Sequence, residues 1–231
     1  AKYRLGLTKP QQVELANLRR DLNTPEGLAL KQQLIGNALT LVRDEKNLIG
    51  FPNLENTKFA TVAIGDTGRT IFQTYCGQYA PMTHFNTPKE VSDSLEAKLL
   101  DSLGQYDVVL VGLYGIRTTP KPNRAVNPEP GADTIYGLTQ SELRFLRTLN
   151  QKSTVVLTVF GNPYTYRWMD APPLLLQAFT EDPMAQQLAA QGLFGANDLN
   201  GILPVTASPW AKFGQGMKKI FPHKRLGYAM P

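Results

Sequence analysis

The stretch from Ser153 to Thr206 reads STVVLTVFGNPYTYRWMDAPPLLLQAFTEDPMAQQLAAQGLFGANDLNGILPVT, and it decides the fold class of this chain. It contains two short apolar runs, Thr154–Val159 and Leu174–Phe179, and then a segment rich in Ala, Gln and Leu that stops at Gly195. Short apolar runs that alternate with helical segments are typical of parallel strands buried on both faces. The stretch therefore predicts an α/β fold, with a further short strand at Ile202–Thr206 after an Asn-Gly turn.

The same alternation continues upstream of this stretch. Apolar runs predict strands at Lys58–Ile64, Met82–Asn86 and Tyr106–Leu113. Helices are predicted between the strands, at residues 69–79, 87–103 and 139–149, and the last begins with a Thr-Gln-Ser-Glu capping box. Together these elements predict a three-layer sandwich with a mainly parallel, flavodoxin-like sheet of about five to six strands.

The first 50 residues depart from this alternation. The segment Asn23–Glu26 is a helix start, because Thr is a favoured N-cap, Pro suits the first helical position and Glu complements the helix dipole. Apolar residues then recur at helical spacing from Leu28 through about Arg43. We predict that residues 1–50 form a helical arm and that residues 51–231 form the α/β sandwich domain.

Composition narrows the classes of protein that this chain represents. With 231 residues, 42% hydrophobic and 19% charged, it suits one sizeable globular domain. The net charge of +5 is scattered and lacks a basic stripe interleaved with aromatics, which argues against a nucleic-acid partner. No apolar stretch approaches the roughly 20 residues of a membrane span. The first seven residues lack the apolar core of a signal peptide, and the compartment stays open.

Residues that commonly carry catalysis or bind metals are sparse. The single cysteine, Cys76, excludes an internal disulfide and is interpreted as a buried structural thiol. The two histidines, His84 and His223, do not have metal-ligand spacing, and we interpret the first as structural and the second as solvated. The chain has no Gly-x-Ser-x-Gly or Ser-x-x-Lys motif. The sequence therefore predicts no catalytic residue, no metal and no cofactor within this chain.

Polar residues follow several predicted strands at their carboxyl ends, where open α/β sheets bind ligands. The turn Gly65-Asp66-Thr67-Gly68 fits neither a dinucleotide-binding nor a phosphate-loop pattern, so a tight strand-to-helix turn is favoured. If the domain contacts a ligand, the candidates for lining a substrate cleft are Asp66, Arg117, Asn162 and Tyr164. Two functions are open at this point: one wall of a partner's active site, or a free-standing flavodoxin-like module that binds a phosphate or flavin.

The order and turn chemistry of the Ser153–Thr206 stretch resemble the C-terminal α/β domain of family 3 glycoside hydrolases. Its usual signature is a strand, Gly-x-Pro, a second strand, a small-residue helix ending near Leu-Phe-Gly, and Asn/Ser-Gly-x-Leu-Pro-Val-Thr. Lys2–Leu7 resembles the segment that leaves the family's barrel, and Ala38–Arg43 resembles its helix ending in Leu-Leu-Lys-Asn. The resemblance covers nearly the whole chain.

The resemblance implies a division of labour in a longer polypeptide. In that family a (β/α)₈ barrel carries the nucleophilic aspartate, and the α/β domain packs against the active-site mouth. The implied parent is a bacterial glycosidase of β-N-acetylhexosaminidase or β-glucosidase type, for which a periplasmic or secreted location is expected. This chain would be its structural or cleft-completing domain, with the barrel as partner and a carbohydrate as the substrate reached through it. Alone, it is expected to be inactive.

Two departures from the family pattern refine this expectation. In β-glucosidase-like members the acid/base glutamate follows the middle strand, but here no Asp or Glu occurs from Val108 through Pro128, and Glu129 lies far along the loop. The chain therefore resembles the β-N-acetylglucosaminidase branch, whose acid/base is a histidine on a barrel loop. The Glu181–Met184 segment also stands where many relatives have a Gly-Gln-Glu turn.

The long Pro/Gly/Asn-rich loop Tyr114–Gly137 is expected to be functional or to face a partner.

Overall fold

The computed structural model describes residues 3–6, 15–119 and 136–222. The chain divides into two compact units, residues 1–34 and 35–231. The first unit holds α1 (Leu18–Leu22) and most of α2 (Pro25–Ala38), neither of which has a buried residue. The predicted N-cap of α2 is confirmed, because Thr24 Oγ1 accepts a hydrogen bond from Gly27 N at 3.1 Å.

Helix α2 ends earlier than the sequence predicted. It stops at Ala38, and Thr40–Asp44 forms strand β1 instead of continuing the helix to Arg43. The reason is tertiary: β1 pairs antiparallel with a strand far along the chain, and it buries Leu41 and Val42 on opposite faces of the sheet. The predicted domain boundary at residue 50 lies beyond β1, whereas the compact units divide after Leu34.

Six strands form one sheet in the order β1-β6-β5-β4-β2-β3. The remaining strands are β2 (Phe59–Ile64), β3 (Met82–Thr87), β4 (Val108–Leu113), β5 (Thr154–Val159) and β6 (Leu174–Gln177). These strands run parallel to their neighbours, and only the edge strand β1 is antiparallel. Counted among themselves, the parallel strands follow the flavodoxin-like order, in which the second strand lies outside the first. The predicted mainly parallel sheet is confirmed.

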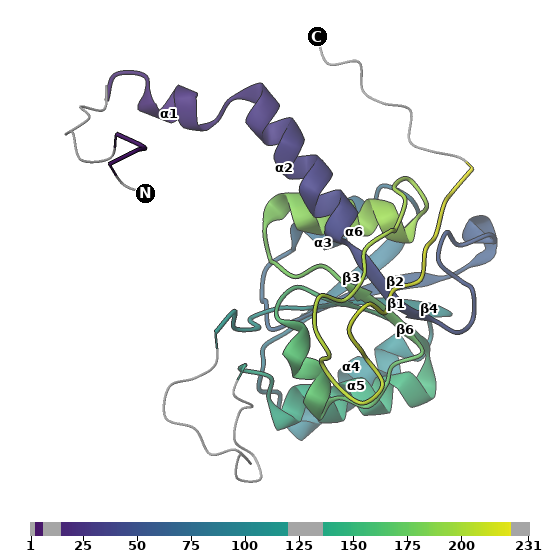
Figure 1. Cartoon of the computed structure of the whole chain (residues 1–231). Helices are drawn as coiled ribbons and strands as arrows, with labels where there is room; N and C mark the ends of the chain where they lie inside the picture. Colours follow the sequence, from purple (N-terminus) through teal and green to yellow (C-terminus); the bar gives the residue numbers. More distant parts are fainter. Residues whose placement is uncertain (1–2, 7–14, 120–135, 223–231) are drawn as a thin grey trace. The chain divides into compact units, whose positions relative to one another are not determined.

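Helices cover both faces of the sheet (Figure 1). One layer holds α3 (Ile71–Cys76) and α6 (Pro183–Leu193), and the other holds α4 (Asp93–Leu103) and α5 (Gln140–Lys152). Two 3₁₀ helices, η1 (Leu54–Asn56) and η2 (Pro163–Trp168), lie in connections. Helix α4 begins later than predicted, because Thr87 completes β3 and Ser92 supplies the N-cap. The predicted capping box of α5 is confirmed, with Thr139 and Glu142 bonding each other's backbone N–H.

The core has one apolar layer on each side of the sheet. Strand β4 contributes to both, with Val109, Val111 and Leu113 facing α4 and α5, and Val108 and Leu110 facing α3 and α6. Burial of both faces explains why this strand is an uninterrupted apolar run. Within the described residues, no helix is both long and apolar enough to span a bilayer.

The buried cysteine belongs to the layer of α3 and α6. Cys76 is fully buried at the end of α3, and burial raises the pKa of its thiol. A thiol that is both inaccessible and hard to ionise is a poor nucleophile. The interpretation of Cys76 as a structural thiol is confirmed.

The predicted terminal strand at Ile202–Thr206 is wrong. This segment instead belongs to a ribbon of residues 199–219, called here the edge ribbon, which folds back on itself and lies against the outer side of β1. Gly201 N donates to Leu39 O at 3.1 Å and Met217 N donates to Leu41 O at 2.7 Å. Pro204 has no N–H with which to continue a ladder. The edge ribbon thereby hydrogen-bonds backbone carbonyls at the edge of the sheet that β1 would otherwise expose.

Candidate functional site

The turn after β2 is closed by its own aspartate. Asp66 Oδ1 accepts from Gly68 N at 2.8 Å, and Asn86 Nδ2 donates to Asp66 O at 3.3 Å. Gly65 has a φ of +85°, and a Cβ there would lie 2.8 Å from Tyr114 O, so only glycine fits. Asp66 thus has a clear local role in the tight turn that the sequence favoured.

The turn after β5 is organised by Asn162. Its Oδ1 accepts from Tyr164 N at 3.0 Å and caps η2, while its Nδ2 donates to Thr118 O at 3.1 Å. The preceding Gly161 is required because a Cβ there would lie 2.4 Å from Ile116 Cβ. One amide side chain therefore joins the carboxyl end of β5 to the segment that follows β4.

A shallow pocket of about 280 Å³, called here the edge pocket, opens beside this turn. It is lined by Thr118, Gly161, Asn162, Pro163, Tyr164, Phe179, Pro204 and Val205. Tyr164 is 39% exposed, and its ring stacks on Tyr136 with centroids 5.9 Å apart and an interplanar angle of 22°. The structure therefore brings together two of the predicted cleft residues, Asn162 and Tyr164.

The other two predicted residues lie outside the lining of the edge pocket. Arg117 is exposed on the stem of the long loop, next to Thr118, and its N–H donates to Tyr136 O at 2.8 Å. Asp66 follows β2, which is separated from β5 by β4 in the sheet order. Arg117 thus borders the pocket, and Asp66 is remote from it.

Phe179 lines the edge pocket from a strained backbone. Its φ is +62°, and Thr180 N donates to Ala178 O at 2.8 Å, which makes a γ-turn of the uncommon positive-φ kind. The buried amide of Gln177 fixes the turn, since its Nε2 donates to Gly161 O at 2.6 Å and its Oε1 accepts from Tyr166 OH. Sequence reasoning missed Phe179, because nothing in its neighbours indicates a left-handed backbone.

Lys89 joins both stems of the long loop. Its Nζ donates to Gly115 O at 2.9 Å and to Gly137 O at 2.6 Å, and lies 3.6 Å from the fully buried carboxylate of Glu142. Gly115 is also bonded through its N–H, which donates to Glu181 Oε1 at 2.5 Å. Lys89 and Glu181 therefore hold Gly115 from two sides, and sequence reasoning identified neither role.

These contacts lie at the crevice in which flavodoxin-like proteins bind ligands. That crevice lies where the strand order reverses, which here is between the carboxyl ends of β2 and β4. The backbone of Gly65 packs against Tyr114 O, and a Cβ on Gly115 would lie 2.5 Å from Lys89 Cε. The edge pocket lies beside the carboxyl ends of β5 and β6. The alternative of a flavin- or phosphate-binding module gains no support from this geometry.

Tyr114 near this edge has a structural role. Tyr114 is buried, its ring stacks on Phe160 at 4.9 Å, and its hydroxyl donates to Gln186 Oε1 at 3.3 Å. Burial raises the pKa of the Tyr114 hydroxyl far above its ordinary value, so this group stays neutral. Among the described residues, no three His, Cys, Asp or Glu side chains gather as metal ligands would. Glu129 and His223 lie outside those residues.

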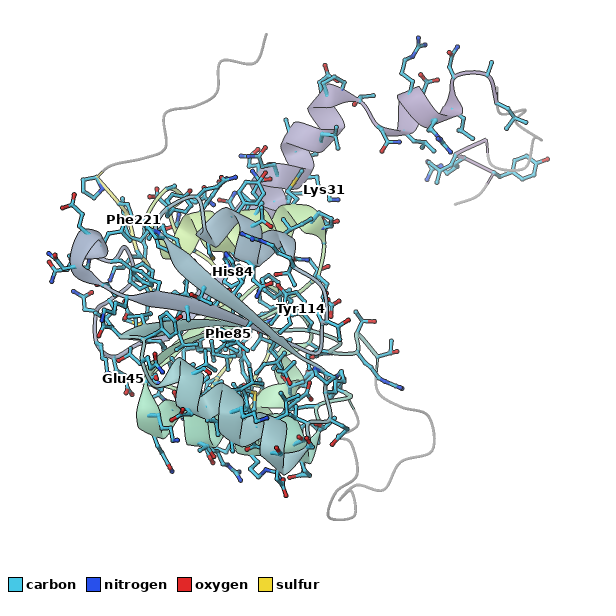
Figure 2. The ribbon with its side chains drawn as sticks, turned by 180° about the vertical axis from the view of Figure 1, so that it is seen from behind. Lys31, Glu45, His84, Phe85, Tyr114 and Phe221 are labelled. Carbon is cyan, nitrogen blue, oxygen red and sulfur yellow. The ribbon has the colours of Figure 1, made fainter. Side chains whose placement is uncertain are left out.

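His84 on β3 is hydrogen-bonded through both ring nitrogens, which supports its interpretation as a structural histidine. Figure 2 shows His84 and Phe85 on opposite faces of this edge strand. Arg69 Nη2 lies 2.9 Å from His84 Nε2, and because Arg can only donate, Nε2 must accept. Nδ1 then carries the proton and donates to Thr61 Oγ1 at 2.8 Å. Partial burial and the Arg69 charge both lower the pKa of His84.

This lowered pKa predicts a pH dependence of stability. The unfolded chain takes up a proton on His84 near pH 6.5, whereas the folded protein does so only at lower pH. The stability contribution is therefore complete above about pH 6.5 and is lost as pH falls from there through the folded-state pKa. Urea unfolding at about pH 7.5 and about pH 5.5 should show a smaller loss for His84→Gln than for the unsubstituted protein. Equal losses would contradict the assignment.

The sequence matches no protein-family profile and no curated protein. Solved structures do match it. A family 3 β-N-acetylglucosaminidase from Paenibacillus is similar with a TM-score of 0.63 at 15% identity, over 90% of this chain and 37% of that one. A β-glucosidase from Erythrobacter marinus has a TM-score of 0.67 at 15% sequence identity, and the match covers 94% of this chain and 38% of that one. A β-glucosidase from Listeria innocua has a TM-score of 0.62 at 15% sequence identity, and the match covers 94% of this chain and 37% of that one.

The chain has the fold of a domain of family 3 glycoside hydrolases. The resemblance drawn from the sequence is thereby confirmed at the level of the fold. The chain spans well under half the length of each of these solved chains, with shares of 37% to 38%. The rest of each of those chains lies outside the match.

Proposed function

We propose that this chain is the C-terminal α/β domain of a family 3 glycoside hydrolase, and that its edge pocket forms one wall of the sugar cleft. The observation that carries the proposal is the edge pocket itself, which lies at the carboxyl ends of parallel strands and is lined by two side chains predicted from sequence. The fold match to parts of larger glycosidases supports it. The catalytic barrel is the proposed partner within the same polypeptide.

The chemistry of the edge pocket suits a pyranose ring. Tyr164 and Phe179 offer aromatic ring surface and Val205 offers aliphatic surface, against which the C–H face of a sugar can pack. The Asn162 amide uses one N–H in its bond to Thr118 O and one oxygen lone pair in its bond from Tyr164 N. Its second N–H and second lone pair can therefore form hydrogen bonds with a sugar hydroxyl. A few polar groups on an apolar wall fix orientation in this kind of site.

The lining of the edge pocket lacks the groups that cleave a glycosidic bond. Most glycosidases use two carboxyl groups about 5 to 9.5 Å apart across the bond. None of the described residues that line the edge pocket is an Asp or Glu, and the nearby Glu181 accepts from Gly115 N. The domain therefore positions and encloses the sugar, and the companion barrel supplies the reacting groups.

The test uses the full polypeptide identified from the coding sequence that adjoins this chain. The adjoining coding sequence is expected to encode a barrel. The full polypeptide is expected to hydrolyse p-nitrophenyl N-acetyl-β-glucosaminide or p-nitrophenyl β-glucoside, whereas this chain alone is expected to hydrolyse neither. Tyr164→Ala in the full polypeptide should raise KM about tenfold with a smaller change in kcat, because it removes binding surface. Phe213→Ala, which removes a 71% exposed aromatic ring from the edge ribbon, is the matched control and should change neither constant. Turnover by the isolated chain, or the absence of a barrel, overturns the proposal.

A further inference from the structure

A second cavity, of about 240 Å³, lies between α5, β5 and the segment that joins η2 to β6. We call it the α5 cavity, and it shares no lining residue with the edge pocket. Its floor is apolar and consists of Leu143, Leu146, Val155, Leu157 and Met169, each at most 8% exposed. The cavity is open at one side, and its size above an apolar floor is sufficient for a small apolar group.

The mouth of the α5 cavity carries one positive and one negative charge. Arg147 on α5 donates through Nε to Asp170 Oδ2 at 2.6 Å, and the side chains are 55% and 72% exposed. An exposed pair of this kind contributes little to stability. The contact engages only part of each group, since a guanidinium has two further nitrogens and a carboxylate has a second oxygen. Asn150 and Gln151 complete the polar rim.

The floor and the mouth together select a class of ligand. A purely apolar cavity of about 150 Å³ is large enough for benzene, so this one accepts a phenyl or branched alkyl group. Sugar hydroxyls placed against the apolar floor would lose their hydrogen bonds to water without replacement. A phosphate or other anion would meet a mouth whose two charges cancel. An apolar group that carries both charges at one end fits both parts.

We propose that the α5 cavity binds a free α-amino acid with a large apolar side chain, such as phenylalanine. The side chain enters the floor beside Leu146 and Leu157. The α-carboxylate is bound by the Nη groups of Arg147, which form a planar fork suited to a carboxylate. The α-ammonium is bound by Asp170. This site is independent of the proposed sugar cleft.

The experiment is an NMR titration of this chain with L-phenylalanine, observing the methyl signals of Leu143, Leu146, Val155, Leu157 and Met169. Saturable shifts at these methyls are expected. 3-Phenylpropionate and phenethylamine, which each keep one charge, should bind about tenfold more weakly or worse. Glucose should leave these signals unmoved.

Substitutions at the mouth locate the site. Arg147→Gln and Asp170→Asn should each weaken phenylalanine binding about tenfold, and both change exposed side chains, so folding is preserved. Arg144→Gln is the matched control, because Arg144 lies on the same helix but pairs with Glu96 and Asp93. No shift at about 10 mM ligand, equal binding of the singly charged analogues, or equal affinity of the Arg147→Gln and Arg144→Gln variants overturns the proposal. None of these results bears on the edge pocket.

Discussion

Replacing Lys89 with Met is expected to lower the free energy of unfolding by about 3 kcal/mol. The substitution removes two hydrogen bonds to the loop stems and also the ammonium that lies 3.6 Å from the fully buried carboxylate of Glu142. Removing the ammonium beside a buried carboxylate is strongly destabilising in a protein interior. The Lys89 side chain is 29% exposed, so water reaches part of the site. The expected loss of stability is therefore at the lower end of the range for broken buried ion pairs. Urea unfolding monitored by circular dichroism measures it.

Two comparisons separate this mechanism from a general effect of losing a lysine. Lys98→Met makes the same chemical change at an exposed position of α4 and should stay within about 0.5 kcal/mol of the parent. Glu142→Gln added to Lys89→Met removes the buried charge while keeping an oxygen that can cap Thr139 N, and should recover part of the lost stability. Equal losses for the Lys89 and Lys98 variants would refute the role assigned to Lys89.

The Lys89 substitution also has a local readout at the proposed cleft. Gly115 and Gly137 carry the stems from which Arg117 and Tyr136 extend, and Tyr136 stacks on Tyr164 of the edge pocket. Release of the stems should weaken the near-ultraviolet signal of the stacked tyrosines and speed amide exchange at Arg117, whose N–H bonds Tyr136 O. Lys98→Met should change neither signal.

The parallel strands were predictable because a strand that is buried on both faces has apolar side chains at consecutive positions. Strand β4 is covered on both faces, so every position from Val108 to Leu113 except Gly112 is a large apolar residue. Capping chemistry is equally local, and the box formed by Thr139 and Glu142 marked the start of α5 to within a residue.

The errors concern segments whose structure depends on distant partners. Residues from Thr40 to Asp44 extend the apolar spacing of α2, and their strand conformation comes from pairing with β6. Short apolar runs do not distinguish helix from strand on their own. Residues Ile202–Thr206 look like a strand, but the backbone of Leu203 pairs with Gly214 and Gln215 of its own ribbon.

The candidate site divides in the same way. Asn162 and Tyr164 could be placed at the pocket because they follow an evident strand, and the carboxyl ends of parallel strands meet at one edge. Lys89, Phe179 and Glu181 could not, because their roles arise from contacts with Gly115 and Gly137 and from a positive φ. Neither a contact between distant segments nor a strained dihedral angle leaves a pattern in nearby residues.

Gly201 in the edge ribbon is expected to tolerate no side chain. A Cβ at this position would lie 2.5 Å from Ala38 O, Leu39 O and Thr40 Oγ1, and two of these atoms are backbone. Since Gly201 N also donates to Leu39 O, the ribbon cannot move away without losing that bond to the sheet. Gly201→Ala is therefore expected to cost about 3 kcal/mol of folding stability, as an overpacked contact with backbone that cannot shift.

The loss should begin at the edge of the sheet, where hydrogen exchange can detect it. In Gly201→Ala the amide of Met217, which donates to Leu41 O, should exchange much faster, while amides in β4 keep their protection relative to the new global stability. Gly104→Ala is the matched control, because a Cβ there would find its nearest neighbour, Leu100 O, at an ordinary 3.4 Å. Gly104 already has a right-handed helical backbone, so its replacement should be neutral or slightly stabilising. If the two alanine variants unfold at the same urea concentration, close packing against β1 is not the reason for glycine in this motif.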